Sequence, residues 1–164
     1  MNGDSTDFKQ LIRQYAAPLV LYARQFFGHA DFHAAEEIVQ DAFFRLSRER
    51  NPPEKPVAWL YRTVRHRAIS AARSEKRRKK RETCREMPLF QPDSVDPIEA
   101  KEIAQALRHL DLEQREIVTM HIWSDLSFAE IGILLGKPKT TLFRRYEEAL
   151  DTLRQLLASN EHDF

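Results

Sequence analysis

Cationic and hydroxyl side chains gather near the C-terminus, at the start of an expected helix. Residues 126–154 read LSFAEIGILLGKPKTTLFRRYEEALDTLR. Arginine, lysine and threonine side chains donate hydrogen bonds to phosphates and to base edges, so several of them on adjacent helical turns can bind DNA. The members of this set are Lys139, Thr140, Thr141, Arg144 and Arg145. We expect all five to be offered to solvent.

The residues around this set predict a helix-turn-helix. Ser127 followed by Glu130 is a capping box, which satisfies free amides at a helix start. Gly136 suits a left-handed position at the helix end, and Pro138 prevents that helix from continuing. The second helix has an apolar stripe of Leu142, Tyr146, Ala149 and Leu153. In a helix-turn-helix the N-terminal residues of the second helix contact base edges in the major groove. An ordinary helical hairpin with a solvated charged face is the structural alternative.

The charges of the chain are strongly segregated, although its net charge is only +1. Residues 57–85 carry 11 basic and 2 acidic side chains, whereas residues 86–136 carry 3 basic and 10 acidic ones. A basic segment inside an otherwise acidic chain is typical of a protein that binds a polyanion. The net charge of the chain does not reveal this segment, because the acidic residues elsewhere cancel its positive charge.

The composition favours an all-α protein. The 164 residues include only four glycines, and 42% of them are hydrophobic. The single cysteine, Cys84, excludes an internal disulfide framework. Because the sequence shows neither a signal peptide nor an apolar run long enough to cross a bilayer, we expect a cytoplasmic protein.

The N-terminal half predicts three helices. The first begins near Ser5 or Thr6, with a kink or break at Pro18 and an end at Gly28, and Asp31 could cap the second, over residues 34–48. Prolines at 52, 53 and 56 require a loop before the third helix, which starts at Pro56. That helix carries a basic face, and Trp59 and Tyr61 near its start could stack on exposed bases. The run 76–81 could bind phosphates or form a solvated tail.

A domain boundary is expected in residues 83–97, where three prolines interrupt the hydrophobic periodicity. The chain would then comprise a domain over residues 5–82, a flexible linker over 83–97 and a second domain over 98–158. In the second domain, helices over 98–110 and 112–123, with Ile103 among the inward residues, would support the helix-turn-helix.

Catalytic motifs are scarce, so we do not expect an enzyme. The sequence contains no P-loop, no glycine-rich nucleotide fingerprint and no nucleophile elbow. His29 and His33, with Glu36 or Glu37, form only a weak metal-ligand pattern, and we expect neither a metal nor a cofactor.

The motifs together resemble the extracytoplasmic-function (ECF) class of bacterial sigma factors. The similarity rests on AAEEIVQDAFFRL (residues 34–46), AWLYRTVRHRAI (58–69) and the helix-turn-helix of residues 126–154, in this order and spacing. It implies two helical domains, sigma domain two and sigma domain four. It also implies binding to core RNA polymerase and the direction of that enzyme to promoters.

The resemblance assigns roles to individual residues. Core polymerase binding falls to Glu37, Gln40, Asp41 and Arg45. The promoter −10 element falls to Arg50, Asn51, Trp59, Arg62, Arg65, His66, Arg67 and Arg73. The −35 element falls to Lys139, Thr140, Thr141, Arg144 and Arg145. On this assignment, alanine at Arg145 is expected to change the preference among −35 sequences.

Three residues depart from the family pattern. Ser70 replaces a usual aspartate, Thr140 replaces a common glycine, and the pair Glu147 and Glu148 stands where a basic residue is frequent. The acidic pair weakens phosphate contacts late in the recognition helix and leaves the promoter sequence open.

Two other classes of function compete with a sigma factor. A stand-alone helix-turn-helix regulator would need a dimerisation helix, and the segment after Leu157 is too short for one. A protein-binding adaptor would not need the basic residues between Arg62 and Arg85. We therefore expect a monomer that binds core RNA polymerase and promoter DNA, with an anti-sigma factor as an open possibility.

Overall fold

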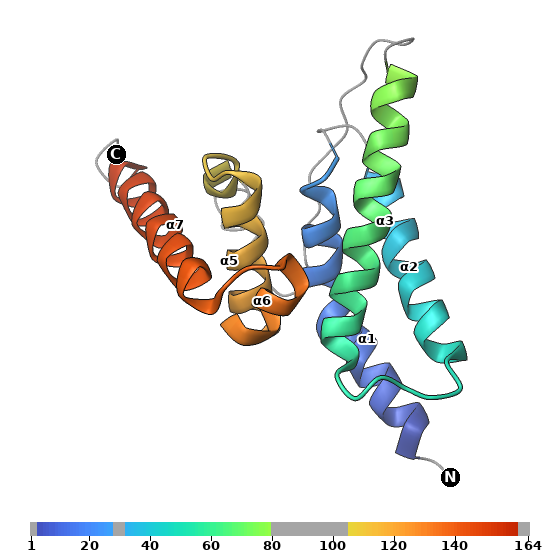
Figure 1. Ribbon diagram of the computed structural model, residues 1–164. Coiled ribbons are helices and arrows are strands. Elements are labelled where there is room, and N and C mark those ends of the chain that lie inside the picture. Colours follow the sequence, from blue (N-terminus) through green and yellow to red (C-terminus); the bar gives the residue numbers. More distant parts are fainter. Residues whose placement is uncertain (1–2, 28–31, 80–104, 161–164) are drawn as a thin grey trace. The chain divides into compact units, whose positions relative to one another are not determined.

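The chain divides into two compact units, unit 1 (Met1–Pro88) and unit 2 (Leu89–Phe164). The computed structural model describes residues 3–27, 32–79 and 105–160 of them (Figure 1). These residues form helices joined by turns, with no strand among them. The prediction of an all-α fold is confirmed. The expected linker over 83–97 lies outside the described residues.

Unit 1 is built from three helices, α1 (Gly3–Arg24), α2 (Phe32–Arg48) and α3 (Pro56–Lys79), and each packs against the other two. Their shared core contains fully buried side chains from every helix, among them Leu19, Tyr22, Ala42, Leu60, Tyr61 and Val64. The rings of Tyr22 and Tyr61 meet edge to face with their centroids 4.9 Å apart, which joins α1 to α3. Burial of this apolar surface is the main force that holds the three helices together.

Of the kink or break expected at Pro18, the break does not occur, because α1 continues through the proline to Arg24. Proline removes one internal hydrogen bond from a helix. Leu19 and Tyr22, directly after the proline, are fully buried, so tertiary packing compensates for that loss. Beyond Arg24 the chain turns with three-residue hydrogen bonds, such as Phe27 N–H to Arg24 O. The predicted roles of Gly28 and Asp31 lie outside the described residues.

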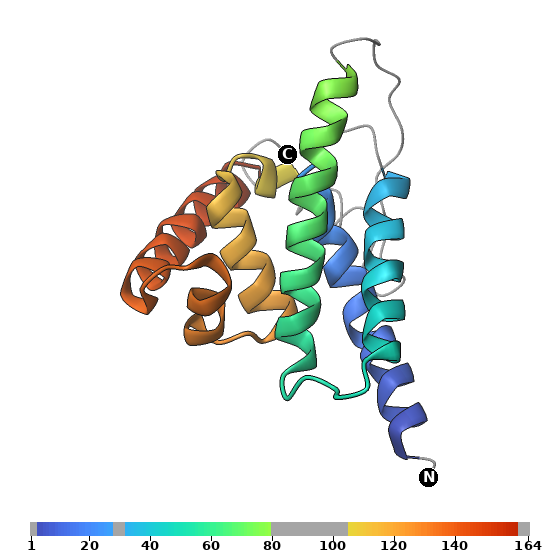
Figure 2. The same cartoon turned by 45° about the vertical axis from the view of Figure 1, so that its right-hand side comes forward.

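Pro56 is the first residue of α3, as predicted, and residues 49–55 form the loop before it. The fixed φ of proline suits the first helical position, where no internal N–H bond is lost. Figures 1 and 2 show the C-terminal turns of α3 extending beyond α1 and α2. The basic run begins on this extension, but its side chains lie outside the described ones.

Unit 2 contains α5 (Leu112–Ser124), α6 (Phe128–Leu135) and α7 (Lys139–Asn160), preceded by a helical segment over 105–108. A buried cluster ties these segments together: Leu107, Leu110, Val118 and Ala149, with Trp123, Tyr146 and Leu153 packed on it. Ile117 and Met120 are also fully buried. Ile103 and the first part of the helix predicted over 98–110 lie outside the described residues.

Local capping fixes the ends of α5 and α6. Asp111 caps α5 and shares a capping box with Gln114, and Ser127 caps α6 in the predicted box with Glu130. Such side chains satisfy amides that have no partner inside the helix. Gly136 ends α6 in the left-handed region, with φ of 66°, as predicted. Asp125 ends α5 in the same region, with φ of 52°.

Candidate nucleic-acid interface

The turn between α6 and α7 forms the predicted helix-turn-helix. Lys137 N–H donates to Gly132 O at 3.0 Å, so the turn lies directly against α6. A Cβ added at Gly132 would be 2.7 Å from Lys137 O, which means that no side chain fits there. The sequence analysis did not identify Gly132, although a glycine in the middle of an apolar helix is a signal of close backbone approach.

The first turns of α7 present a mixed cationic and hydroxyl surface. Lys139 and Thr140 are exposed and Thr141 is half-buried, while Leu142 beside them is fully buried and anchors the helix. The side chain of Arg144 is 69% exposed and donates only a long 3.3 Å bond to Glu148. Lys139, Thr140 and Arg144 are therefore the most exposed of the five predicted residues, and they lie in the first turns of the helix, where groove contacts are made.

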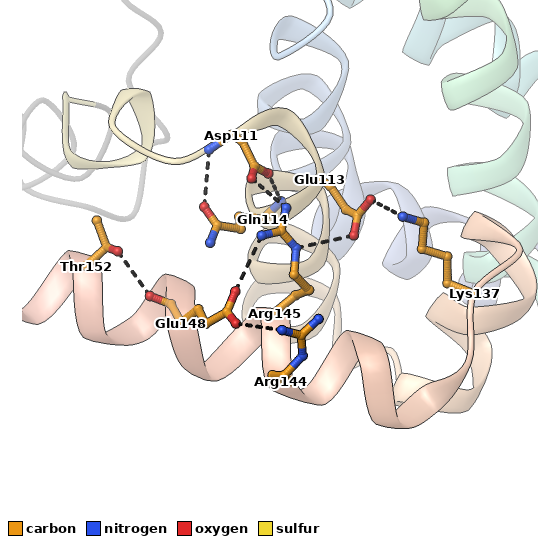
Figure 3. Close-up of polar contacts among 8 residues, drawn as sticks. All are labelled: Asp111, Glu113, Gln114, Lys137, Arg144, Arg145, Glu148 and Thr152. Carbon is orange, nitrogen blue, oxygen red and sulfur yellow. Dashed lines mark hydrogen bonds and ion pairs between the residues drawn. The ribbon is translucent and has the colours of Figure 1, made fainter.

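Arg145 is less exposed than expected, because its guanidinium is directed back onto α5 (Figure 3). Its side chain is only 26% exposed, and it donates to Asp111 Oδ2 at 2.5 Å. It also lies 3.5 Å from Glu113 Oε1 and 3.4 Å from Glu148 Oε2. The residue is thus half-buried, and its ion pairs hold it between two helices.

The contacts between Arg145 and these carboxylates shift the pKa values of both Asp111 and Arg145. Burial alone would raise the pKa of Asp111, but hydrogen bonds from Gln114 N–H and from Arg145 outweigh it and hold that pKa below its ordinary value. The hydrogen bond to Asp111 is the main reason why the pKa of Arg145 lies above its ordinary value. Lys137 Nζ, at 2.5 Å from Glu113 Oε2, ties the turn to the same part of α5 (Figure 3). The network therefore sets where the start of α7 lies relative to α5.

An aromatic cluster lies where α5, α6 and α7 meet. The Phe128 ring stacks on His121 with centroids 4.4 Å apart, and Tyr146 meets Phe128 edge to face at 5.3 Å. His121 Nδ1 is 2.8 Å from Leu126 O. Phe143 extends the cluster toward solvent, with its ring 5.6 Å from that of Phe128. Phe143 was not predicted as a site residue, because it is apolar and lies outside the apolar stripe of this helix.

A groove of about 890 Å³ runs between α2 and α3 in unit 1. Its walls combine three residues predicted for polymerase binding with three predicted for the −10 element: Glu37, Asp41, Arg45, Arg62, His66 and Arg67. Thr63, Ser70 and Ser74 also line it, and the sequence analysis did not name them as site residues. Gln40 is exposed on α2 outside the groove wall.

Asp41 links the two sides of this groove. Its Oδ2 accepts a 2.8 Å hydrogen bond from Arg45 Nε on the same helix and another from Arg67 on α3. The charges of Asp41 and Arg67 therefore compensate each other in this structure, although the two residues were predicted to serve different partners. The pair joins α2 to α3 across 26 positions of sequence.

The residues predicted for the −10 element are spread over the loop and the face of α3. Arg50 and Asn51 are exposed in the loop, and Arg62, His66 and Arg73 are exposed on α3. Trp59 and Arg65 are half-buried. The suggestion that Tyr61 stacks on bases is wrong, because its side chain is fully buried against Tyr22.

Among the described residues, no group of three or more His, Cys, Asp or Glu side chains is placed to hold a metal ion. His29 lies outside them. No helix in the described part of the chain has the length and hydropathy needed to cross a membrane.

Two family models match the chain, each within one unit. The model for sigma-70 region 2 matches residues 11–78, and the model for sigma-70 region 4 matches residues 100–153. The chain thus belongs to the sigma factors of bacterial RNA polymerase, with the pairing of regions 2 and 4 that defines the ECF class. Proteins of this family bind core RNA polymerase and direct promoter recognition and transcription initiation.

Solved structures share the fold. The sigma factor RpoE in complex with the anti-sigma factor NepR from Bartonella quintana is 24% identical, with a TM-score of 0.70, over 93% of this chain and 97% of that one. CnrH in complex with the cytosolic domain of CnrY is 22% identical, with a TM-score of 0.62, over 96% and 92% of the two chains. No curated protein matches the chain.

Proposed function

We propose that the two units of this sigma factor divide its work, with unit 2 reading the −35 element and unit 1 holding polymerase and the −10 element. The observation that carries the proposal is the exposed start of α7, where Lys139, Thr140 and Arg144 follow a rigid turn. Side chains at this place in a helix-turn-helix reach base edges in the major groove. Arg144 supplies the fork-shaped donor that pairs bidentately with guanine.

Arg145 has a positioning role in this proposal. Its ion pairs with Asp111 and Glu113 hold the start of α7 against α5, and Lys137 does the same for the turn. A base-reading side chain needs a fixed orientation, because a small displacement breaks a bidentate hydrogen bond. The network supplies that rigidity without itself contacting DNA.

In unit 1, the exposed side of α2 binds core polymerase through Glu37, Gln40, Asp41 and Arg45. The loop of Arg50 and Asn51 and the start of α3 bind the −10 element. Exposed arginines on α3 contact phosphates, and Trp59 stacks on an unpaired base. Arg65, Arg67 and Arg73 complete this cationic face, with Arg67 oriented by Asp41.

The cellular setting follows from the function. A factor that works on polymerase and promoter DNA acts in the cytoplasm. It is an initiation factor and not an enzyme. An anti-sigma factor belongs to the proposal, because NepR and CnrY accompany the two solved sigma factors that share this fold.

Two substitutions on α2 test the polymerase contact. Gln40 is exposed, whereas Asp41 is bonded to two arginines. Gln40→Ala should weaken binding to core polymerase and leave thermal unfolding unchanged. Asp41→Asn should weaken the same binding and also lower the free energy of unfolding of unit 1 by less than about 1 kcal/mol, the range of exposed ion pairs.

Binding would be measured by competition with a labelled copy of the full chain for core polymerase. Ser47→Ala, on the same helix, is a matched control, because the Ser47 hydroxyl is directed to the Phe44 carbonyl of its own turn. Unchanged polymerase binding in both the Gln40 and Asp41 variants would overturn the assignment of α2.

A further inference from the structure

Phe143 is a large apolar side chain displayed among the polar residues of α7. It lies between Leu142, which is fully buried, and Arg144, and Phe143 itself is 47% exposed. Lys139 and Thr140, four and three positions earlier, are its neighbours on the helix surface and are exposed too. The surface proposed to read DNA therefore has an apolar centre.

The Phe143 ring is held in place from one side. Its centroid is 5.6 Å from that of Phe128, with the ring planes at 86°. Phe128 is fixed in turn by stacking on His121 at 4.4 Å. Since edge-to-face contacts favour one relative orientation, the exposed part of the Phe143 ring is preorganised and does not sweep through solvent.

We propose that Phe143 reads the 5-methyl group of a thymine in the −35 element. Each base pair presents hydrogen-bonding groups in the major groove, and thymine adds the one apolar group there, with phenylalanine among the side chains that contact it. Arginine on the same face reads hydrogen-bond acceptors and each threonine offers a single methyl group, whereas the Phe143 ring offers the largest exposed apolar surface at the start of α7. The inference rests on the proposed function of unit 2 and adds a specificity-determining residue to it.

DNA suits this surface better than a protein partner does. Phe143 is surrounded by Lys139, Thr140 and Arg144, and cationic and hydroxyl neighbours match phosphates and base edges. A protein-binding hot spot would instead be expected to lie within a wider apolar patch. A protein partner at Phe143 is one of the outcomes that the experiment distinguishes.

Deoxyuridine in place of thymine tests the proposal without altering the protein. Holoenzyme would be assembled from the full chain and core polymerase, and the −35 sequence would be selected from a randomised library. Each selected thymine would then be replaced by deoxyuridine, which lacks only the methyl group. Loss of one buried methyl contact should weaken binding about fourfold at one position.

Variants of the chain identify the side chain responsible. Phe143→Ala should bind thymine and deoxyuridine promoters equally, and Phe143→Leu, which keeps an apolar group near Phe128, should retain part of the difference. Ile122→Ala is the matched control, because Ile122 is a comparably exposed apolar residue, 45% exposed, on α5. This control should keep the full fourfold difference. Thermal unfolding of each variant separates a lost contact from a lost fold.

Four results would overturn the proposal. The first is equal binding of thymine and deoxyuridine at every position by the unaltered chain. The second is a methyl effect that persists in a folded Phe143→Ala variant. The third is loss of polymerase binding with unchanged −35 preference in that variant, which would assign Phe143 to a protein contact. The fourth is a holoenzyme that selects no −35 sequence at all, and this result alone would also overturn the proposed function of unit 2.

Discussion

Arg144 and Arg145 are adjacent in the chain, but their guanidinium groups have different surroundings. The side chain of Arg144 is 69% exposed, whereas that of Arg145 is 26% exposed and pairs with Asp111 and Glu113. Adjacent residues on a helix differ by about 100° in direction, so one can face DNA while the other faces the protein. We therefore expect the two arginines to have separable effects, Arg144 on promoter preference and Arg145 on stability.

Alanine at each position should separate these effects. Arg144→Ala should lose about tenfold in discrimination at one base pair of the −35 element, within the range for a bidentate arginine–guanine contact. Arg145→Ala should lower the free energy of unfolding of unit 2 by about 1 kcal/mol and reduce activity at all promoters alike, because it removes a network of ion pairs. Transcription across a −35 library and thermal unfolding measure the two quantities.

The opposite pattern would contradict this account. If Arg145→Ala changes the order of preferred −35 sequences and leaves stability intact, then Arg145 leaves Asp111 when DNA binds. Thr152→Ala is a control further along α7, where the Thr152 hydroxyl donates to the Glu148 carbonyl of its own helix. It should alter neither the order of promoters nor their level.

Asp111 makes the stability of unit 2 depend on pH. Its pKa lies below the ordinary value of 3.8 in the folded chain, since hydrogen bonds from Gln114 N–H and Arg145 outweigh the effect of burial. The unfolded state thus binds the proton more readily. The stabilisation by the carboxylate is present above pH 3.8 and is lost as the pH falls through the lower folded value.

Asp111→Asn isolates this charge, because asparagine caps helices about as well as aspartate. The variant should be less stable than the unaltered chain at pH 7 by up to about 1 kcal/mol, the range for an exposed pair. The difference should shrink as the pH is lowered below 4. Denaturant unfolding at several pH values measures it. A difference that stays constant down to pH 2 would show that the ion pair contributes nothing and that the cap accounts for the whole effect.

At the scale of elements, the turn from α6 to α7 depends on two glycines for different reasons. Gly136 needs its positive φ of 66°, and a Cβ there would meet nothing within 4 Å. Gly132 lies in regular helix, but a Cβ there would be 2.7 Å from the backbone oxygen of Lys137. The first glycine permits a conformation, while the second permits a close approach of two elements.

Alanine at Gly132 should therefore displace the turn and the start of α7 with it. We expect a loss of about 1–3 kcal/mol in stability, the usual cost of overpacking, together with loss of −35 preference. Gly136→Ala should cost about 1–2 kcal/mol through backbone strain, and Gly136→Asn should cost less, since asparagine tolerates this region. Unfolding and −35 selection would be measured together. Equal tolerance of alanine at both glycines would contradict the packing of the turn on α6.

Local signals in the sequence predicted much of the fold. The capping box at Ser127, the left-handed end at Gly136 and the helix start at Pro56 depend on residues within four positions of each other, and the structure confirms all three. Local signals did not predict the continuity of α1 through Pro18, because that continuity depends on the packing of neighbouring side chains. The break expected there followed from local bonding alone.

The parts of the site that sequence missed depend on residues far apart in the chain. Arg145 was expected to face solvent, but its partner Asp111 precedes it by 34 positions. Tyr61 was expected near bases, and its contact Tyr22 belongs to another helix. A helical repeat indicates which residues share a face, but it does not indicate which face another element covers. The contact of Phe143 with Phe128 was also missed, because Phe128 belongs to another helix.

At the scale of the whole molecule, a sigma factor of this kind is expected to use both units together on one polymerase. Regions 2 and 4 match separate units, so we expect each promoter element to contact a different unit. A stand-alone regulator would bind its DNA without polymerase and would need two copies on a palindromic site. The two possibilities therefore predict different requirements for DNA binding.

Transcription from a randomised promoter library by core polymerase, with and without the full chain, tests the central claim most directly. We expect transcripts only when the chain is present, from promoters that share two sequence elements at a fixed separation. The Arg144→Ala chain should change the upstream element and leave the downstream element unchanged. If the chain produces no transcripts with core polymerase but binds palindromic DNA by itself, it is a stand-alone regulator and the account is wrong.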